Sequence, residues 1–531
     1  MRRQRISRLA AAALILTAIA GGAQAQKPGG VLRIYHRDSP ASMSVHEEGS
    51  NSVSIPMMAV FNNLVLYDQH LAQNSLDHIV PDLAESWSWN ADGTRLSFKL
   101  RDGVKWHDGK PFTAADVKCT WDLLTGRSTE KLRANPRKSW WSNVAEIAVD
   151  GPLQATFVLT RPQPAILALL ASGWSPVYPC HIPPPQMRQH PIGTGPFKFV
   201  EFKPNESIKL ARNPDYWKPG RPYLDGIDYT IIPNRSTAIL AFVAGQFDLT
   251  FPYEVTVPLI KDLKQQAPQA ICELVPANSS TNLLVNREAP PFDNADLRRA
   301  LALALDRKSF IDILAEGQGD IGAAMEPAPS GVWGMPDDKL ATVPGYDPDI
   351  AKNRAAAREI MTKLGYGPDK RLAIKVAARN IATYRDPALI LIDQLKEIWI
   401  DAELDAIETA NWFPKLARKD YQIGVNNTGS AVDDPDQQFF ENYACGSERN
   451  YTGYCNKDLE TLFVEQSTTA DQEKRKKLVW DIDKKLQEDG ARPIIYHTRL
   501  GTCMQPQLKG LTVMVNSQYN GWRMEDFWLD R

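Results

Sequence analysis

The chain has 531 residues, and its composition, 43% hydrophobic and 23% charged, is that of an ordinary globular protein with about three or four domains. Without the four arginines of the first 25 residues, the formal net charge falls from −2 to −6. This acidic balance excludes a protein built to bind nucleic acid or an anionic membrane surface.

The first 25 residues have the pattern of an export signal. Four arginines precede the apolar stretch Leu9–Ala20, which is too short to span a bilayer, and Ala23-Gln24-Ala25 is a small-x-small cleavage site. We therefore expect a mature periplasmic chain that begins at Gln26. No cysteine follows the site, so no lipid anchor is expected, and Arg2-Arg3 leaves export by the Sec or the twin-arginine route open. No later apolar run reaches ~18 residues, which predicts a soluble mature protein.

Strand and helix patterns alternate along the rest of the chain and predict an α/β fold. Val31–Tyr35 alternates like a strand, and Ser52–Tyr67 carries apolar residues at helical spacing. In Leu83–Asp122, a turn, an alternating strand and a second turn precede a helix that a capping box at Thr113–Asp116 opens. Further strands are predicted at Ala155–Leu159, Phe197–Phe202, Ile227–Ile232, Leu372–Ala377 and Glu403–Ile407, and further helices at Ser236–Ala244, Asn294–Leu305, Ile350–Leu364, Pro387–Ile400 and Thr468–Glu488.

Motifs for catalysis and for metal binding are missing from the sequence. The eight histidines form no pair at helical spacing, and there is no G-x-S-x-G, H-E-x-x-H or phosphate-binding loop. Gly193-Thr194-Gly195-Pro196 is better explained as a turn before a strand, because proline lacks an N–H that could hold phosphate. The acidic run Asp433-Asp434-Pro435-Asp436 lacks the glycine and distal glutamate of a calcium loop and is expected to be a solvated loop. We expect neither an enzyme nor a bound cofactor or metal.

Aromatic and cysteine residues supply weaker signals. Trp140, Trp141 and Trp412 lie in or beside polar segments, either as core residues or as flat walls of a small-molecule pocket. Cys445 and Cys455 flank a short glycine-containing loop in which a disulfide is geometrically plausible. No pairing can be chosen for the other cysteines, Cys119, Cys180, Cys272 and Cys503, and Cys119 is expected to be a buried small hydrophobe in a helix.

The stretch Leu83–Asp122 resembles a hallmark of the family 5 extracellular solute-binding proteins of ABC importers, the periplasmic dipeptide- and oligopeptide-binding group. It reads LAESW, then DGTRLSFKLRDGVKWHDGKPFTAADVKCTWD. The resemblance covers nearly the whole mature chain in family order, because it continues at Gly193–Phe197, Ala211–Ile227, Ala241–Leu249 and Asn286–Arg307.

The resemblance implies an α/β, two-lobed periplasmic binding protein fold, with discontinuous lobes around a ligand cleft and an extra small inserted domain. Lobe I would comprise residues 26–67, 192–279 and 500–531, and lobe II residues 280–499. The inserted domain would comprise residues 68–191. On this division Leu83–Asp122 belongs to the inserted domain and is scaffold, which agrees with the explanation of its residues by turns, strand alternation and a helix cap.

The resemblance also implies which residues contact the ligand. The loop after the first strand, with Glu48, Gly49 and Ser50, would line the cleft. Trp412 matches a tryptophan that packs on ligand side chains. Arg379 matches an arginine that grips a ligand carboxylate, for which a forked guanidinium is suited, although a surface loop charge is the alternative. The Cys445–Cys455 loop resembles a bridged loop of the dipeptide binders.

One position departs from the peptide-binding pattern. The peptide binders place an aspartate, which pairs with the free amine of the peptide, where this chain has Ala431. Either Asp433 or Asp434 replaces it, or the ligand keeps a carboxylate but lacks a conventional peptide N-terminus. The complete set of expected ligand-binding residues is Glu48, Gly49, Ser50, Trp140, Trp141, Arg379, Trp412, Ser430, Asp433, Asp434 and His497.

The expected function is that of a periplasmic receptor that delivers a small peptide or peptide-like carboxylate to the permease of an ABC importer in the inner membrane. We expect a monomer without a nucleic-acid partner. The same transport role for an opine-like conjugate, a sugar or a chelated metal is an alternative, because one fold hosts many ligands. A secreted hydrolase and a periplasmic chaperone-like binder are alternatives of other classes.

Overall fold

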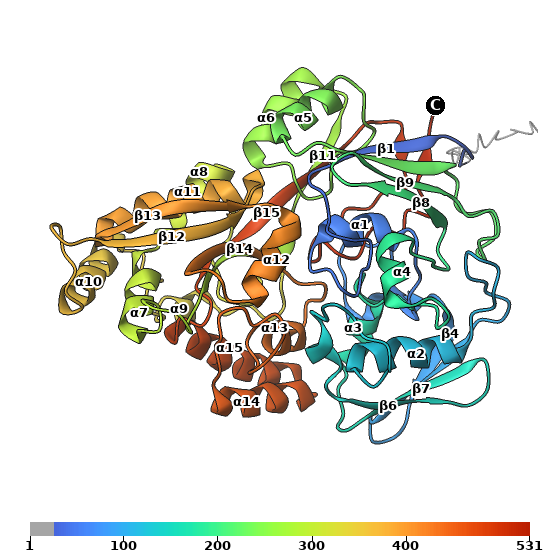
Figure 1. The fold of residues 1–531 in the computed structure, drawn as a ribbon, viewed down its shortest axis with the longest axis horizontal. Coiled ribbons are helices and arrows are strands. Elements are labelled where there is room, and N and C mark those ends of the chain that lie inside the picture. The colour runs from blue at the N-terminus through green and yellow to red at the C-terminus, as the bar shows by residue number, and fades with distance from the viewer. Residues whose placement is uncertain (1–25) are drawn as a thin grey trace, which may run out of the picture.

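The computed structural model describes residues 26–531, which form two lobes connected by long strands (Figure 1). The expected export signal, with its cleavage site, lies outside these residues. Within them, no helix is both long and apolar enough to cross a membrane.

Lobe I is built on a four-stranded sheet in the order β1-β10-β9-β8. Strand β1 is parallel to β10, and the remaining pairs are antiparallel. The strands are β1 (Val31–His36), β8 (Phe197–Lys203), β9 (Ser207–Arg212) and β10 (Gly226–Ile231), and the helices of this lobe are α1 (Asn51–Met58), α5 (Arg235–Val243) and α6 (Val257–Gln266).

The helix expected over Ser52–Tyr67 is shorter than its apolar pattern suggests. Helix α1 ends at Met58, and the chain continues into the short strand β2 (Val65–Tyr67), which pairs with β3 (Ile79–Pro81). The carbonyls of Val60 and Ala59 accept the N–H groups of Gly195 and of Phe197, the first residue of β8, instead of continuing a helix. Tertiary hydrogen bonds therefore override the local helical pattern in this segment.

The inserted domain contains an antiparallel sheet in the order β4-β5-β7-β6. Thr113 and Asp116 form the predicted capping box at the start of α2. The hydrophobic core of this sheet is continuous with that of lobe I, and the predicted boundaries at residues 68 and 191 remain predictions. The elements are β4 (Ala84–Trp89), β5 (Arg95–Leu100), α2 (Ala114–Thr125), a 3-10 turn (Lys138–Trp141), β6 (Val144–Val149), β7 (Gln154–Leu159), α3 (Ile166–Ala171) and α4 (Pro184–Gln189).

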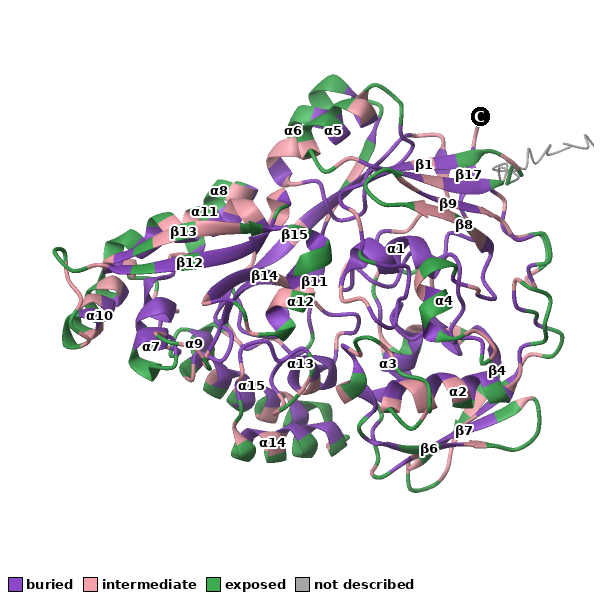
Figure 2. Ribbon diagram, viewed as in Figure 1, coloured by how far each residue is buried: buried purple, intermediate pink, exposed green. Residues whose placement is uncertain are grey.

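Lobe II has a five-stranded sheet in the order β13-β12-β14-β11-β15. Its strands are β11 (Ile271–Val285), β12 (Leu372–Arg379), β13 (Ile400–Ile407), β14 (Ile423–Gly429) and β15 (Ile494–Met504). Its helices are α7 (Ala295–Ala304), α8 (Arg307–Ala315), α9 (Asp337–Leu340), α10 (Ile350–Lys363), α11 (Ala382–Leu395), α12 (Thr409–Ala417), α13 (Pro435–Asn442), α14 (Lys457–Thr468) and α15 (Gln472–Glu488). The strands β12, β14 and β15 are largely buried, whereas α10 and α14 expose one face (Figure 2).

The long antiparallel strands β11 and β15 connect the two lobes (Figure 1). Their pairing is interrupted between Pro276 and Ser280, where Asn278 has a positive φ of 48°. The chain ends beyond them, where β16 (Leu508–Lys509) pairs with β17 (Trp528–Leu529). The sequence patterns do not predict β11 or β15. The buried half of β11 contains the polar run Asn278–Asn282, and β15 is buried on both faces, so neither strand shows alternation of apolar and polar residues.

All six cysteines are paired, in the bonds Cys445–Cys455, Cys119–Cys180 and Cys272–Cys503. The expectation that Cys119 is an unpaired hydrophobe is therefore wrong. Its helix α2 lies beside the segment that contains Cys180, and that tertiary contact brings the two sulfur atoms together.

We expect Gly193→Ala to destabilise the protein by about 1–3 kcal/mol or more, since 1–3 kcal/mol is the typical effect of overpacking. A β-carbon at Gly193 would lie 1.9 Å from the Val60 carbonyl oxygen, which is backbone and cannot move aside. Gly367→Ala is a matched control, because a β-carbon there meets no heavy atom within 4 Å. Urea midpoints measure both changes, and equal midpoints would contradict the close packing at Gly193.

Candidate functional site

A cavity of ≈ 20 Å³ lies where the two lobes meet, which is room for about one water molecule. Lobe I contributes Arg37, Gly49, Ser50 and Asn51, and the C-terminal segment contributes Leu500, Gln518 and Tyr519. Lobe II contributes Arg379, Thr383, Tyr384, Phe413, Asn427 and Arg449. Three arginines and no carboxylate are therefore among the lining residues.

The strand ends explain why polar groups gather at this cavity. Arg37 and Asp38 directly follow β1, and Arg379 is the last residue of β12. In open sheets with parallel strands, ligand sites form beyond the carboxyl ends of the strands, where the chain turns into a loop or helix. Ser50 lies beside them as the N-cap of α1, and its hydroxyl accepts the N–H of Ser52.

Arg379 of lobe II forms an ion pair with Asp38 of lobe I. Its Nη2 lies 2.6 Å from an Asp38 carboxylate oxygen, and the two residues are 1% and 4% exposed. The hydroxyls of Thr409 and Ser52 donate to the same carboxylate, each at 2.5 Å. Burial alone would raise the pKa of Asp38, but the guanidiniums of Arg379 and Arg37 outweigh it and hold that pKa well below its ordinary value.

A second buried pair connects the lobes through Arg37. Its Nη1 donates to Glu254 at 2.8 Å, and the other oxygen of Glu254 accepts the hydroxyl of Thr383 in lobe II at 3.0 Å. The Arg37 Nε is buried without a hydrogen-bond partner among the described residues. This nitrogen is therefore a donor beside the cavity that a ligand oxygen could use.

Several further hydrogen bonds connect lobe II with lobe I and with the inserted domain. The Trp140 indole donates to Glu441 at 2.5 Å, and the Gln163 amide donates to Asp436 at 2.9 Å. Arg449 donates to the Gly49 carbonyl at 3.3 Å. These direct contacts define a closed arrangement of the two lobes.

The expected site residues divide into two groups. Gly49, Ser50 and Arg379 line the cavity. Glu48 is adjacent, but its carboxylate pairs with Arg133 and accepts the hydroxyl of Ser42, so it points elsewhere. Trp140 is only 2% exposed and acts through its bond to Glu441.

Other expected residues do not line the cavity. Trp412 is fully buried beneath Gly424 in a separate hydrophobic cluster, and its neighbour Phe413 lines the cavity instead. The Ser430 hydroxyl accepts a hydrogen bond from Gln438. One ring nitrogen of His497 lies 2.9 Å from the Ala323 carbonyl oxygen, and burial lowers the pKa of this histidine to about 4.

The acidic run at Asp433 is not the solvated loop that the sequence suggested. Asp434 caps α13 and accepts two hydrogen bonds from Arg475, at 2.7 and 2.8 Å. Asp433 accepts the Val332 N–H at 3.0 Å. Asp434 and Asp436 are both buried, and neither Asp433 nor Asp434 takes the place of a ligand-facing aspartate at the cavity.

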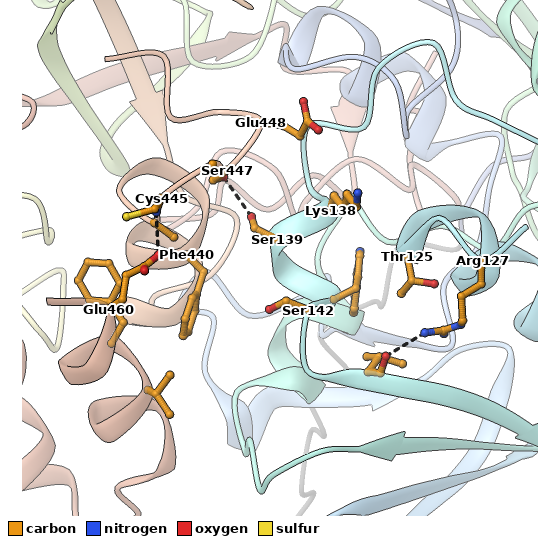
Figure 3. Close-up of a pocket in the computed structure, with 16 residues that line it drawn as sticks. Thr125, Arg127, Lys138, Ser139, Ser142, Phe440, Cys445, Ser447, Glu448 and Glu460 are labelled. Atoms are coloured by element: carbon orange, nitrogen blue, oxygen red, sulfur yellow. Dashed lines mark hydrogen bonds between the residues drawn. The ribbon is translucent and has the colours of Figure 1, made fainter. Parts of the chain in front are cut away.

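A larger pocket of ≈ 600 Å³ lies outside this contact, between the inserted domain and lobe II (Figure 3). Trp141 lines it, together with Ser139, Ser447 and the disulfide residue Cys445. The Ser447 hydroxyl donates to that of Ser139 at 3.4 Å, and the Cys445 N–H donates to Glu460 at 2.8 Å. We place the principal site at the smaller cavity, because the buried charges of both lobes converge there.

Arg37, Arg449 and the ion-pair partner Asp38 were missed by sequence reasoning. For Arg37 and Asp38, the only local signal is that they directly follow a predicted strand. Arg449 lies in the loop between Cys445 and Cys455, and nothing in the sequence connects it with Gly49, 400 residues away.

A buried acid beside the connecting strands predicts pH-dependent stability. Glu326 accepts the Asn278 N–H at 3.2 Å, and burial, reinforced by Asp433, raises the pKa of Glu326 to about 8. Because the folded pKa exceeds the unfolded one, the folded state retains a proton that the unfolded state has lost, and stability falls as pH rises towards 8. Buried histidines such as His497 have lowered pKa values, so their opposite effect is complete above about pH 6.5.

We therefore expect urea stability to fall between pH 6.5 and 8 by up to about 1.4 kcal/mol per pH unit from Glu326. Glu326→Gln should flatten this fall, whereas Glu448→Gln, at an exposed glutamate, should not. An identical slope in the unchanged protein and in Glu326→Gln would contradict the assignment.

Comparisons with known proteins agree with this architecture. A family model described as bacterial extracellular solute-binding proteins, family 5 Middle, matches residues 78–450. The dipeptide-binding protein of Escherichia coli is 25% identical over 462 residues, which are 82% of this chain and 84% of that protein. The heme-binding protein A of Haemophilus influenzae is 27% identical over 449 residues, 79% of this chain and 78% of that protein.

A solved structure shares the fold. The dipeptide-binding protein of Pseudoalteromonas sp. SM9913 in complex with Met-Leu superposes with a TM-score of 0.84 at 20% identity, over 94% of this chain and all of that one. The predicted two-lobed fold is thereby confirmed.

Proposed function

Because the chain belongs to the family 5 bacterial extracellular solute-binding proteins, we propose that it captures a small peptide or peptide-like carboxylate between its lobes and delivers it to the permease of an ABC importer. Family members are binding proteins of transporters, not enzymes, and we propose that this chain breaks no bond in its ligand. The site of action would be the periplasm.

The observation that carries this proposal is the cavity between the lobes with its buried guanidiniums. Ligand capture by hinge motion requires polar groups that both lobes bring to one place on closure. Arg37 and Gly49 come from lobe I, and Arg379 and Arg449 come from lobe II. Guanidinium groups have the forked geometry that a carboxylate accepts in a bidentate manner.

Relatedness does not choose between ligands. The relatives include proteins named for a dipeptide and for heme at similar identity.

Native mass spectrometry of protein purified without refolding tests the proposal. We expect one small molecule bound to each chain, released intact on denaturation, and rebinding with one-to-one saturation in calorimetry. A ligand that is recovered as cleavage products would instead support a secreted hydrolase. Binding of unfolded chains without saturation by a small molecule would support a chaperone-like binder.

A further inference from the structure

Buried guanidinium groups outnumber carboxylates beside the cavity. Arg449 lines it, and Arg137 and Arg492 lie close behind, where all three side chains are less than one-tenth exposed. In the described part of the chain, only one carboxylate lies within ion-pair distance of any of them. It belongs to Glu441 and lies 2.9 Å from the Arg449 Nε. This group of four residues, called the arginine cluster below, has two more positive than negative charges.

Arg137 has no carboxylate within ion-pair distance among residues 26–531. Its Nη1 donates to the carbonyls of Glu48, at 3.0 Å, and Val45, at 3.4 Å, while its Nη2 is buried without a hydrogen-bond partner in the same residues. Its guanidinium carbon lies 3.4 Å from the ring centre of Trp174. Burial, reinforced by the like charge of Arg449, lowers the pKa of Arg137 to about 9.

Arg492 is held in the same way by neutral groups. Its Nη1 donates to the amide oxygen of Asn442 at 2.8 Å and to the Thr428 hydroxyl at 3.2 Å, and its Nη2 donates to the Arg449 carbonyl at 3.1 Å. A buried charge without an opposite partner is unfavourable by several kcal/mol. An anion that enters the cavity would remove part of this penalty, which gives it a source of affinity that a neutral ligand lacks.

A ligand ammonium group would find no comparable partner. Asp38 is engaged by Arg379, and Glu254 by Arg37. Ala431, in the loop after β14, is fully buried, and its N–H and carbonyl are both engaged, with Gln437 and Asn520. No aspartate or glutamate is among the residues that line the cavity.

We propose that the ligand is an anion without a free amine, such as a peptide-like carboxylate whose N-terminus is blocked. This inference rests on the proposed capture function and specifies the chemical class of its ligand. The N-terminus of α1 contributes in the same direction, because Ser50 and Asn51 line the cavity at the end of the helix where the backbone dipole is positive.

Three compounds of equal length test the inference on the unmodified protein. L-alanyl-L-alanine carries both charges, N-acetyl-L-alanyl-L-alanine carries only the carboxylate, and L-alanyl-L-alaninamide carries only the ammonium. In calorimetry we expect the acetylated compound to bind about tenfold or more tightly than the free dipeptide, and the amide to bind most weakly. Equal or tighter binding of the free dipeptide overturns the inference but leaves the capture function intact. Failure of all three to bind counts against both.

Two charge-neutralising variants are expected to change the ligand affinity in opposite directions. Arg449→Gln removes a cation from the arginine cluster, and Glu441→Gln removes its carboxylate with little change of shape. With N-acetyl-L-alanyl-L-alanine, we expect Arg449→Gln to weaken binding about tenfold or more and Glu441→Gln, whose amide oxygen can still accept the Trp140 indole, to tighten it. The reverse order, with Glu441→Gln the weaker binder of this anion, would show that the excess positive charge of the arginine cluster does not contribute to binding and would overturn the inference.

Arg307→Gln is the matched control for these variants. Arg307 is also a buried arginine that donates to carbonyl groups, those of Ile494 and Gly345, but it lies in lobe II away from the cavity. It should change melting temperature without changing affinity. An equal loss of affinity in Arg307→Gln and Arg449→Gln would attribute the effect to general destabilisation and contradict a role of the arginine cluster.

Discussion

Replacing Arg379 with methionine is expected to shift the protein towards an open arrangement of its lobes and to weaken ligand binding about a hundred- to a thousandfold. The substitution leaves the Asp38 carboxylate buried without its guanidinium partner whenever the lobes close. Removing one member of a buried ion pair costs about 3–5 kcal/mol. Asp38 can regain water when the lobes separate, so the substitution destabilises the closed arrangement and not the open one. Each 1.4 kcal/mol of this destabilisation weakens ligand binding about tenfold.

Small-angle X-ray scattering and calorimetry measure the two effects. Without ligand, Arg379→Met should have a larger radius of gyration than the unchanged protein, while its melting temperature changes little. Arg371→Met is the control, because Arg371 pairs with Asp401 on the surface, where ion pairs contribute little. Unchanged scattering with lowered affinity would instead mean that Arg379 binds the ligand without holding the lobes.

The double substitution Cys272→Ala with Cys503→Ala is expected to lower the free energy of unfolding by about 5 kcal/mol. This disulfide joins directly paired residues of β11 and β15, the strands that connect the lobes, and it closes a loop with a sequence separation of 231. A cross-link of this kind stabilises mainly by restricting the unfolded chain, and the restriction grows with loop length.

The Cys445–Cys455 bond is the internal control, since its sequence separation is only 10. By loop length alone, the longer loop should contribute about 3 kcal/mol more. Urea unfolding of the two double variants, under oxidising conditions, compares them. A larger loss in the short-loop variant would show that native contacts around Cys445, and not chain entropy, decide the order.

Local sequence patterns predicted the elements that local interactions stabilise. The capping box at Thr113 and the apolar stripe of Asn294–Leu305 both correspond to helices in the structure, α2 and α7. Helix α11 begins at Ala382, five residues before the predicted start at Pro387, so this proline lies inside the helix and does not mark its beginning. The long strands β11 and β15 escaped prediction because neither alternates: β15 is buried on both faces, and the buried half of β11 contains the polar run Asn278–Asn282.

The candidate site was less accessible to sequence reasoning. Gly49, Ser50 and Arg379, which the family resemblance implies as ligand contacts, line the cavity, and their contact with a ligand stays a prediction. Trp412, implied in the same way, is buried behind Phe413. One step along α12 turns a side chain by about 100°, and a resemblance at low identity does not fix that rotation. The partner of Arg379, Asp38, lies 341 residues earlier in the chain.

The sequence by itself determined the class of this protein, because the ordered motifs from Leu83 to Arg307 and the order of strands and helices depend on local turns, caps and periodicity. Only the tertiary structure decided which charges are already paired and which are not. Arg379 lies with Asp38, Arg37 with Glu254, and Arg137 with no carboxylate in the described chain, although all three are simply arginines in the sequence. The physical reason is that the electrostatic character of a buried site depends on distances between groups hundreds of residues apart, which the closing of two lobes sets.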